Sequence, residues 1–117
     1  MMKTKSTITY KKWDIVLVPF PFTNLTTSKK RPALIISPDE YNENLDIVIA
    51  FITSKMDLEY KIGDYKIKGW KKSNLPKPSM IRMKFATIDK TIVLKKIGRL
   101  GNSDIKEFYK VLMDFFG

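Results

Sequence analysis

The chain has 117 residues, of which 44% are hydrophobic and 29% charged, and its 22 basic and 12 acidic residues give a formal net charge of +10. The length fits one folded domain over residues 1–117, and the balance of hydrophobic and charged residues argues against a disordered chain. The sequence contains no apolar run long enough to span a membrane. The absence of histidine and cysteine excludes the usual zinc sites, imidazole acid–base catalysis, thiol nucleophiles and disulfides.

Most of the predicted elements are short strands. Residues 1–10 form a loose basic lead-in without the apolar segment of a signal peptide, and the lack of cysteine favours a reducing, cytoplasmic setting. Segments that are β-branched and apolar, or that alternate between polar and apolar residues, predict strands at 13–20, 31–37, 46–54, 63–70, 79–85 and 91–100. The segment 46–54 is apolar on both faces and is predicted to be the most buried. Polar segments at 22–30, 39–46 and 70–78 predict loops and turns.

The C-terminal segment has a different periodicity. Gly98 predicts a kink in the last strand, and Gly101 marks a break after it. Beyond that break, Asn102 or Ser103 is a suitable N-cap for a helix. Apolar residues then recur at helical spacing, at Ile105, Phe108, Leu112, Phe115 and Phe116. The sequence therefore predicts a small β-barrel with one C-terminal amphipathic helix packed on it.

The excess of positive charge favours a nucleic acid or an acidic protein as the partner. A solvated, lysine-rich surface is the plain alternative. The chain has only three arginines, at Arg31, Arg82 and Arg99. Because arginine offers a planar fork for phosphate or carboxylate, whereas lysine is a more generic charge, each arginine is a candidate for a specific role.

Four segments, taken in order, resemble the motifs of the MazF/PemK (Kid) toxin family. They are WDIVLVPFPFTNLTTSKKRPALIISP at 13–38, AFITSK at 50–55, LPKPSMIR at 75–82, and KKIGRL at 95–100 followed by the terminal helix. The resemblance covers nearly the whole chain and implies an SH3-like β-barrel, mainly β with a C-terminal helix, that forms homodimers. It also implies the toxin of a type II toxin–antitoxin system: an endoribonuclease that needs no metal or cofactor, cuts single-stranded RNA such as mRNA, and is neutralised by a small acidic antitoxin.

Arg31 is the first candidate for catalysis. It ends a polar loop and opens a buried strand directly before Pro32, which anchors its guanidinium beside a basic loop. An arginine so placed can stabilise the extra negative charge of a phosphorane formed during RNA cleavage. The arginine of the family's R-P-A motif has this role. The alternative is a structural arginine paired with a carboxylate at the rim of the barrel.

The resemblance also assigns catalytic roles to Thr53 and Arg82. Thr53 matches the family's catalytic threonine or serine, although a Thr-Ser pair at a strand end is usually only a turn. Arg82 matches a phosphate-binding arginine of Kid-like members, which carry an aspartate two residues later where this chain has Lys84. The first loop, at 22–30, lacks the glutamate or histidine that many members carry, so the sequence identifies no general base.

Further residues are candidates for RNA contacts around this site: Lys29, Lys30, Ser54, Lys55, Ser79 and Lys84. For the lysines, the alternative is a solvated surface, and for Ser79 it is an ordinary hydroxyl at the start of a strand. Trp70, within a cluster of lysines, could stack on a base or close the barrel. Arg99 lies between the last strand and the helix, which favours a structural role.

The sequence leaves two other function classes open. One is an SH3-like nucleic-acid-binding protein without catalysis, which the missing loop glutamate and Lys84 favour. The other is a topoisomerase poison resembling CcdB, but such proteins act through a C-terminal tryptophan, whereas this chain ends in Met-Asp-Phe-Phe-Gly.

Overall fold

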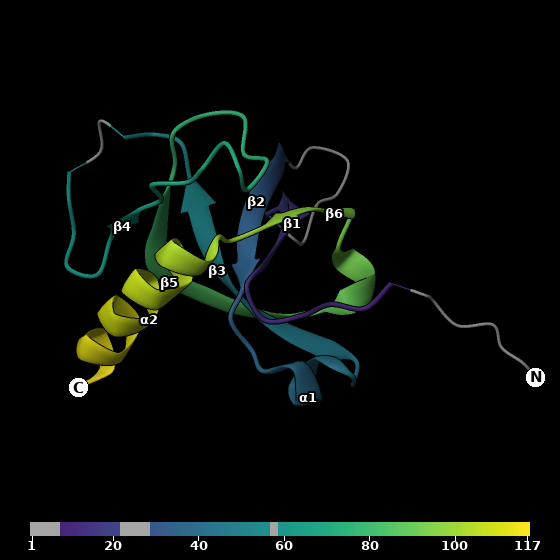
Figure 1. Cartoon of the computed structure of the whole chain (residues 1–117). Coiled ribbons are helices and arrows are strands. Elements are labelled where there is room, and N and C mark those ends of the chain that lie inside the picture. The colour runs from purple at the N-terminus through teal and green to yellow at the C-terminus, as the bar shows by residue number, and fades with distance from the viewer. Residues whose placement is uncertain (1–7, 22–28, 57–58) are drawn as a thin grey trace, which may run out of the picture.

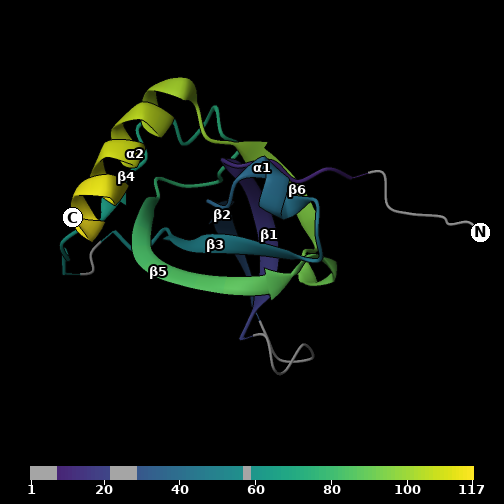
Figure 2. The same cartoon turned by 90° about the horizontal axis from the view of Figure 1, so that it is seen from below.

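The computed structural model describes residues 8–21, 29–56 and 59–117, which form a curved antiparallel sheet and a C-terminal helix (Figure 1). Within these ranges, six strands lie in the order β4-β5-β3-β2-β1-β6. They are β1 (Asp14–Phe20), β2 (Lys29–Ile35), β3 (Asp46–Thr53), β4 (Tyr65–Lys66), β5 (Met80–Asp89) and β6 (Lys95–Arg99). β5 curves around one side of the sheet and makes it half a barrel (Figure 2), which confirms the predicted mainly β, barrel-like fold with a terminal helix.

The strand register decides which side chains share a face of the sheet. β1 pairs with β2 through Val18↔Arg31, and β2 pairs with β3 through Ala33↔Phe51. Residues directly opposite each other in an antiparallel pair point to the same face, as do residues two apart on one strand. Arg31, Ala33 and Phe51 therefore lie on the same face.

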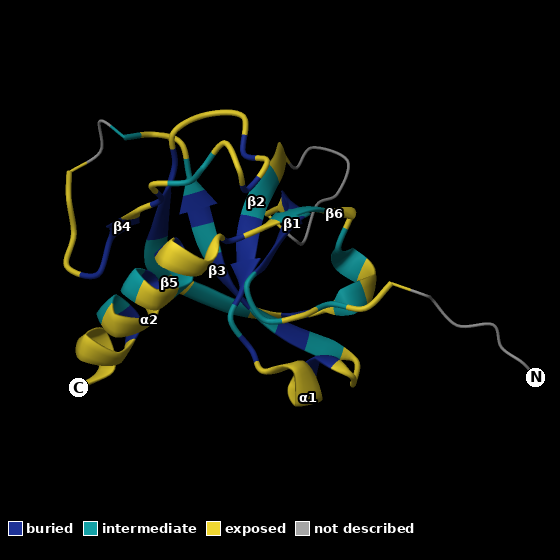
Figure 3. Cartoon of the chain, viewed as in Figure 1, coloured by how far each residue is buried: buried dark blue, intermediate teal, exposed yellow. Residues whose placement is uncertain are grey.

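Both faces of the sheet carry a core, because β3 is apolar on both sides. Ala50 and Ile52 belong to a cluster that includes Phe108 of the C-terminal helix, whereas Ile47 and Ile49 belong to a second cluster on the other face. Figure 3 shows β3 as a mixture of buried and half-buried residues. The prediction that this segment is the most buried is wrong, because four of the eight residues of β3 are buried, against five of seven in β1. The ends of the strands at the rim are the part of the sheet left accessible for function.

The terminal helix, α2 (Asn102–Phe116), is the predicted amphipathic helix. It buries Phe108 and Leu112, whereas Phe116 near its C-terminal end is 64% exposed. The predicted cap was wrong: Gly101 is the N-cap residue and no side chain caps the helix. The helix begins directly after Gly101, where the Gly101 carbonyl accepts from Ile105 N, so Asn102 already lies in the first turn.

Buried Asp104 anchors the first turn of α2 to the segment after β4. Its carboxylate accepts hydrogen bonds from the Tyr65 hydroxyl at 2.6 Å, from Lys68 N at 3.0 Å and from Gly69 N at 2.8 Å. The strand predicted at 63–70 is therefore only two residues long, since the backbone N–H groups after it donate to Asp104 instead of to a neighbouring strand. Burial, with the contact to Asp104, raises the pKa of Tyr65 well above its ordinary value.

Other boundaries also differ from the predictions. β2 begins at Lys29, two residues early, and β5 continues to Asp89. The connection at 39–46 contains a one-turn helix, α1 (Asp39–Asn42). Most of the loop predicted at 22–30 lies outside the described residues. The strand predicted at 91–100 begins at Lys95, because a 3-10 helix, η1 (Lys90–Ile92), precedes it and the Asp89 carboxylate caps that helix by accepting from Thr91 N.

The kink predicted at Gly98 is present as an irregularity in the β1–β6 register. Ile15 pairs with Gly98 but Val16 pairs with Lys96, so one residue of β6 is left over. A β-carbon at Gly98 would lie 2.0 Å from the carbonyl oxygen of Ser73. Glycine is required here by the close approach of a neighbouring backbone.

Candidate active site

Arg31 lies at the start of β2, where that strand leaves the core. The residue is half-buried and its backbone pairs with Val18 of β1. Among the residues that the structure describes, no hydrogen bond or ion pair involves its guanidinium group. The alternative raised by the sequence, a carboxylate partner at the rim, is not found in that part of the chain.

Arg82 has the carboxylate partner that Arg31 lacks. Its Nε lies 3.2 Å from Asp64 Oδ1 and its Nη2 lies 3.0 Å from Asp64 Oδ2, so the two planar groups meet in a bidentate pair. The side chains are 16% and 2% exposed, respectively. Nη2 also donates to the Glu59 carbonyl at 3.4 Å. Arg82 thus satisfies a buried charge in the folded protein, and a phosphate would compete with Asp64 for it.

Arg99 is paired in a similar way. Its Nη1 lies 3.4 Å from Asp14 Oδ1 and donates to the Lys12 carbonyl at 3.0 Å, while Lys96 Nζ lies 3.3 Å from Asp14 Oδ2. This contact joins the start of β1 to β6 and supports the structural role predicted for Arg99. Two of the three arginines therefore hold buried aspartates, and Arg31 differs from both.

Thr53 ends β3, the strand next to β2. The β2–β3 register pairs Ala33 with Phe51, and continuing it by two residues aligns Arg31 with Thr53 on the same face. The Thr53 hydroxyl accepts a hydrogen bond from Lys55 N at 3.1 Å and keeps its own proton available to donate. The register thus brings Arg31 and Thr53 to the same end of neighbouring strands, at one rim of the sheet.

Arg82 and Lys84 lie one strand farther along, on β5. Thr53 pairs with Met80, and Arg82 lies two residues beyond Met80. Lys84 is exposed and lines a pocket of about 370 Å³ together with Arg82, Asp64 and Phe115. The order Arg31, Thr53, Arg82 therefore follows the strand order β2-β3-β5.

The remaining predicted contacts divide into exposed and buried residues. Lys29, Lys30, Ser54 and Lys55 are exposed at the ends of β2 and β3. Ser79 is 3% exposed, and its hydroxyl donates to the Lys77 carbonyl at 2.8 Å. We therefore leave Ser79 out of the site, because a hydroxyl committed to the backbone and buried under its neighbours is not presented to a ligand.

Asp64 is the site residue that the sequence did not reveal. The sequence predicted a strand that includes Asp64. In the structure, Asp64 lies before β4 and directly after a turn at Gly63, whose φ of +94° favours glycine. The one available signal was Arg82 itself, since an arginine within an apolar strand requires a buried partner.

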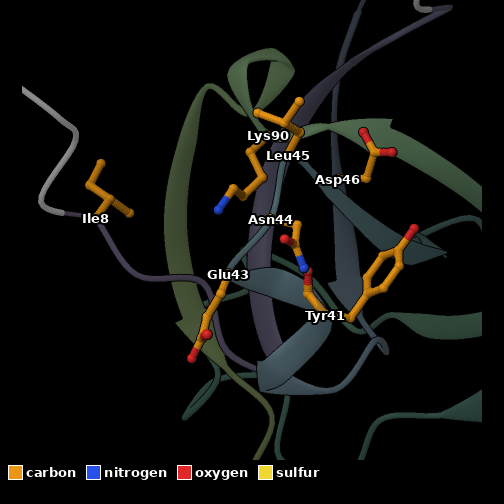
Figure 4. A pocket seen from close by; sticks show the side chains of 7 residues that line it. All are labelled: Ile8, Tyr41, Glu43, Asn44, Leu45, Asp46 and Lys90. Atoms are coloured by element: carbon orange, nitrogen blue, oxygen red, sulfur yellow. The ribbon is translucent and has the colours of Figure 1, made fainter.

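A pocket of about 840 Å³ lies away from the predicted residues (Figure 4). Its lining comes from the α1–β3 connection, from Lys90 of η1 and from Ile8. α1 follows the opposite end of β2 from Arg31, so this pocket and the Arg31 rim are separate features.

Comparison with known protein families gives one match that covers most of the chain. The family described as PemK-like, MazF-like toxin of type II toxin–antitoxin system matches residues 11–116. The chain belongs to this family. The resemblance seen in its sequence motifs is thereby confirmed. None of the curated proteins matches the sequence.

Solved structures of MazF-like proteins share the fold at low sequence identity. MazF from Deinococcus radiodurans is 16% identical with a TM-score of 0.70, covering 94% of this chain and 98% of that one. The Mycobacterium tuberculosis toxin MazF-mt6 is 19% identical with a TM-score of 0.70, covering 88% and 95%. A mycobacterial endoribonuclease in complex with its cognate antitoxin is 13% identical with a TM-score of 0.72, covering 93% and 94%.

Proposed function

We propose that this MazF-like toxin is an endoribonuclease that cuts single-stranded RNA, mRNA included, at the rim formed by Arg31 and Thr53. The observation that carries the proposal is the contrast among the arginines: Arg82 and Arg99 hold buried aspartates, whereas Arg31 lies at the rim beside two exposed lysines. The fold is shared with a protein named as an endoribonuclease and with one named as a MazF toxin, and the net charge of +10 favours a polyanionic substrate.

The proposed reaction is a transfer within the RNA strand. The ribose 2′-oxygen attacks the adjacent phosphorus, and the P–O5′ bond breaks. The 2′-hydroxyl loses its proton to solvent, and the departing 5′-oxygen takes one from solvent. The products are a 2′,3′-cyclic phosphate and a 5′-hydroxyl. Arg31 stabilises the negative charge that builds up on the phosphorane by donating hydrogen bonds to its oxygens. We assign no side chain as the general base.

Thr53 has the role of orienting the phosphate. Its hydroxyl donates to a non-bridging oxygen while it accepts from Lys55 N. Lys29, Lys30, Ser54 and Lys55 contact the flanking phosphates, and Lys84 extends this surface onto β5. Arg82 can contact a phosphate only if its hydrogen bonds to Asp64 break, so we assign it a smaller role in phosphate binding than Arg31.

The family also bears on partners and setting. As a toxin of a type II system, the chain has an antitoxin partner, and we propose that this antitoxin is small and acidic and covers the RNA-binding rim. We further propose that the toxin acts as a homodimer, in the cytoplasm, and without a metal or cofactor. None of the helices that the structure describes has the length and apolar character required to cross a membrane.

The deciding experiment is RNA cleavage in excess EDTA. Purified protein is incubated with single-stranded RNA, and the new ends are mapped. Cleavage that leaves 5′-hydroxyl ends and is abolished in Arg31→Ala supports the proposal. RNA that is bound but intact would instead identify a non-catalytic nucleic-acid-binding protein, and inhibition of gyrase without RNA cleavage would identify a topoisomerase poison.

A further inference from the structure

We infer that the ring of Phe20, supported by Phe51, stacks on an RNA base next to the phosphate that Arg31 contacts. This inference rests on the proposed function, since it assigns a base-binding subsite to the same rim. It arises from an aromatic pair that the proposed chemistry does not use.

The two rings meet above the strand that carries Arg31. Phe20 is on β1 and Phe51 is on β3, and β2 lies between these strands. The ring centroids are nevertheless only 5.1 Å apart, at an interplanar angle of 66°. The pair therefore bridges from β1 to β3 across β2.

The register locates this bridge along β2. Phe20 pairs with Lys29, and Phe51 pairs with Ala33. Arg31 lies midway between Lys29 and Ala33 and points to the same face as both. The contact between the two rings therefore crosses β2 between the rows of Lys29 and Ala33, on the face to which Arg31 points.

The two rings differ in exposure, which divides their roles. Phe51 is half-buried and packs against the core cluster that contains Ala33 and Val16. Phe20 is 37% exposed at the end of β1. Phe51 is thus held by the core and supports Phe20, and the exposed part of the Phe20 side chain lies at the end of β1, where the strand leaves the core.

An aromatic ring beside cationic side chains is the arrangement that binds single-stranded nucleic acid. The bases stack on the ring while Lys29 and Arg31, on the same face, contact the backbone phosphates. Trp70, the aromatic candidate from the sequence, fits less well. It packs against the core cluster that contains Phe108 of α2, and the Lys71 ammonium lies 5.8 Å from its ring centroid.

The test compares binding of strands with and without bases. The probes are a fluorescent, uncleavable 2′-deoxy oligonucleotide of mixed sequence and an abasic strand of the same length, with affinity measured by fluorescence anisotropy. Wild-type protein is expected to prefer the strand with bases. Phe20→Leu is expected to lose about 5- to 100-fold of that affinity but to bind the abasic strand as before. Phe20→Tyr keeps a ring and should retain the preference.

Two controls keep the outcome clear. Tyr41→Leu removes an exposed aromatic on α1, at the far end of β2, and should change neither affinity. Photocrosslinking of wild-type protein to RNA carrying 4-thiouridine needs no variant and should map to the peptide containing Phe20. Equal affinity of wild type and Phe20→Leu for the strand with bases, or crosslinks confined to other peptides, would overturn the inference.

The proposed function can fail separately. If Phe20→Leu loses the preference for bases while wild-type protein leaves RNA uncut, the stacking subsite stands and the nuclease does not. If Arg31→Ala is inactive while Phe20→Leu binds and cuts as wild type does, the nuclease stands and the stacking subsite is wrong.

Discussion

Arg82 and Asp64 form a bidentate ion pair in which the carboxylate is 2% exposed and the nearest nitrogen–oxygen distance is 3.0 Å. The pair joins β5 to the turn before β4, so it holds the edge of the sheet together. It also neutralises one of the two arginines that the sequence offered for catalysis, and this leaves Arg31 as the arginine at the rim with its charge available to a phosphate.

Breaking this pair should destabilise the fold. Asp64→Asn leaves the guanidinium of Arg82 without its counter-charge, and we expect a loss of about 3 kcal/mol in the free energy of unfolding. Urea denaturation measures the change. Asp114→Asn, an exposed substitution on α2, is the matched control and should have little effect. If Asp64→Asn and the control have the same free energy of unfolding, the ion pair does not stabilise the fold.

The contact between Tyr65 and Asp104 predicts a specific sensitivity to alkaline pH. The folded state raises the pKa of Tyr65, so above about pH 10 the unfolded chain loses this proton while the folded chain keeps it. The stabilisation by the hydroxyl is complete below that pH and declines as the pH rises beyond it. The stability difference between wild type and Tyr65→Phe should therefore shrink from pH 8 to pH 11, whereas exposed Tyr109→Phe should differ little from wild type at either pH. A constant difference for Tyr65→Phe would contradict this assignment.

Gly98 should not tolerate a side chain. A methyl group there would lie 2.0 Å from Ser73 O, a backbone atom that cannot move aside easily. We expect Gly98→Ala to cost about 2 kcal/mol or more in thermal or urea unfolding. Gly101→Ser is the control, because no atom lies within 4 Å of its new β-carbon and serine is a good N-cap. Equal stability of the two variants would contradict the close approach of the Ser73 carbonyl to Gly98.

The hydroxyl of Thr53 should matter for the reaction rate more than for stability. Thr53→Ala removes the proposed phosphate donor, and we expect the single-turnover cleavage rate to fall about 100-fold or more. Thr53→Ser keeps the hydroxyl and should keep most of the rate. Thr87→Ala, an exposed threonine on β5, serves as the control. An unchanged cleavage rate in Thr53→Ala would show that the Thr53 hydroxyl has no role in the reaction and only accepts the hydrogen bond from Lys55 N.

The sequence predicted the strands that run through the core but not the segments shaped by distant contacts. β1 and β3 were predicted nearly at their observed bounds, because their apolar patterns reflect burial on the sheet. The short β4 could not be predicted, since Asp104, far along the chain, takes the backbone N–H groups that would have extended it.

The same distinction applies to the site. Arg31 and Thr53 were predicted from local motifs at the ends of strands, and the register then placed them together. The ion pairs of Arg82 and Arg99 depend on aspartates that are distant in sequence, so no local pattern showed that these arginines were already paired. The burial of Ser79 likewise depends on neighbouring segments that the local sequence does not specify.

The most direct test of the central claim compares Arg31→Lys and Arg31→Ala with Arg99→Lys in single-turnover cleavage of single-stranded RNA in EDTA. We predict that wild type and Arg99→Lys cut the RNA, and that both Arg31 variants lose at least about 100-fold in rate while their unfolding midpoints stay near that of wild type. An Arg31→Ala protein that cuts RNA at the wild-type rate would contradict the account.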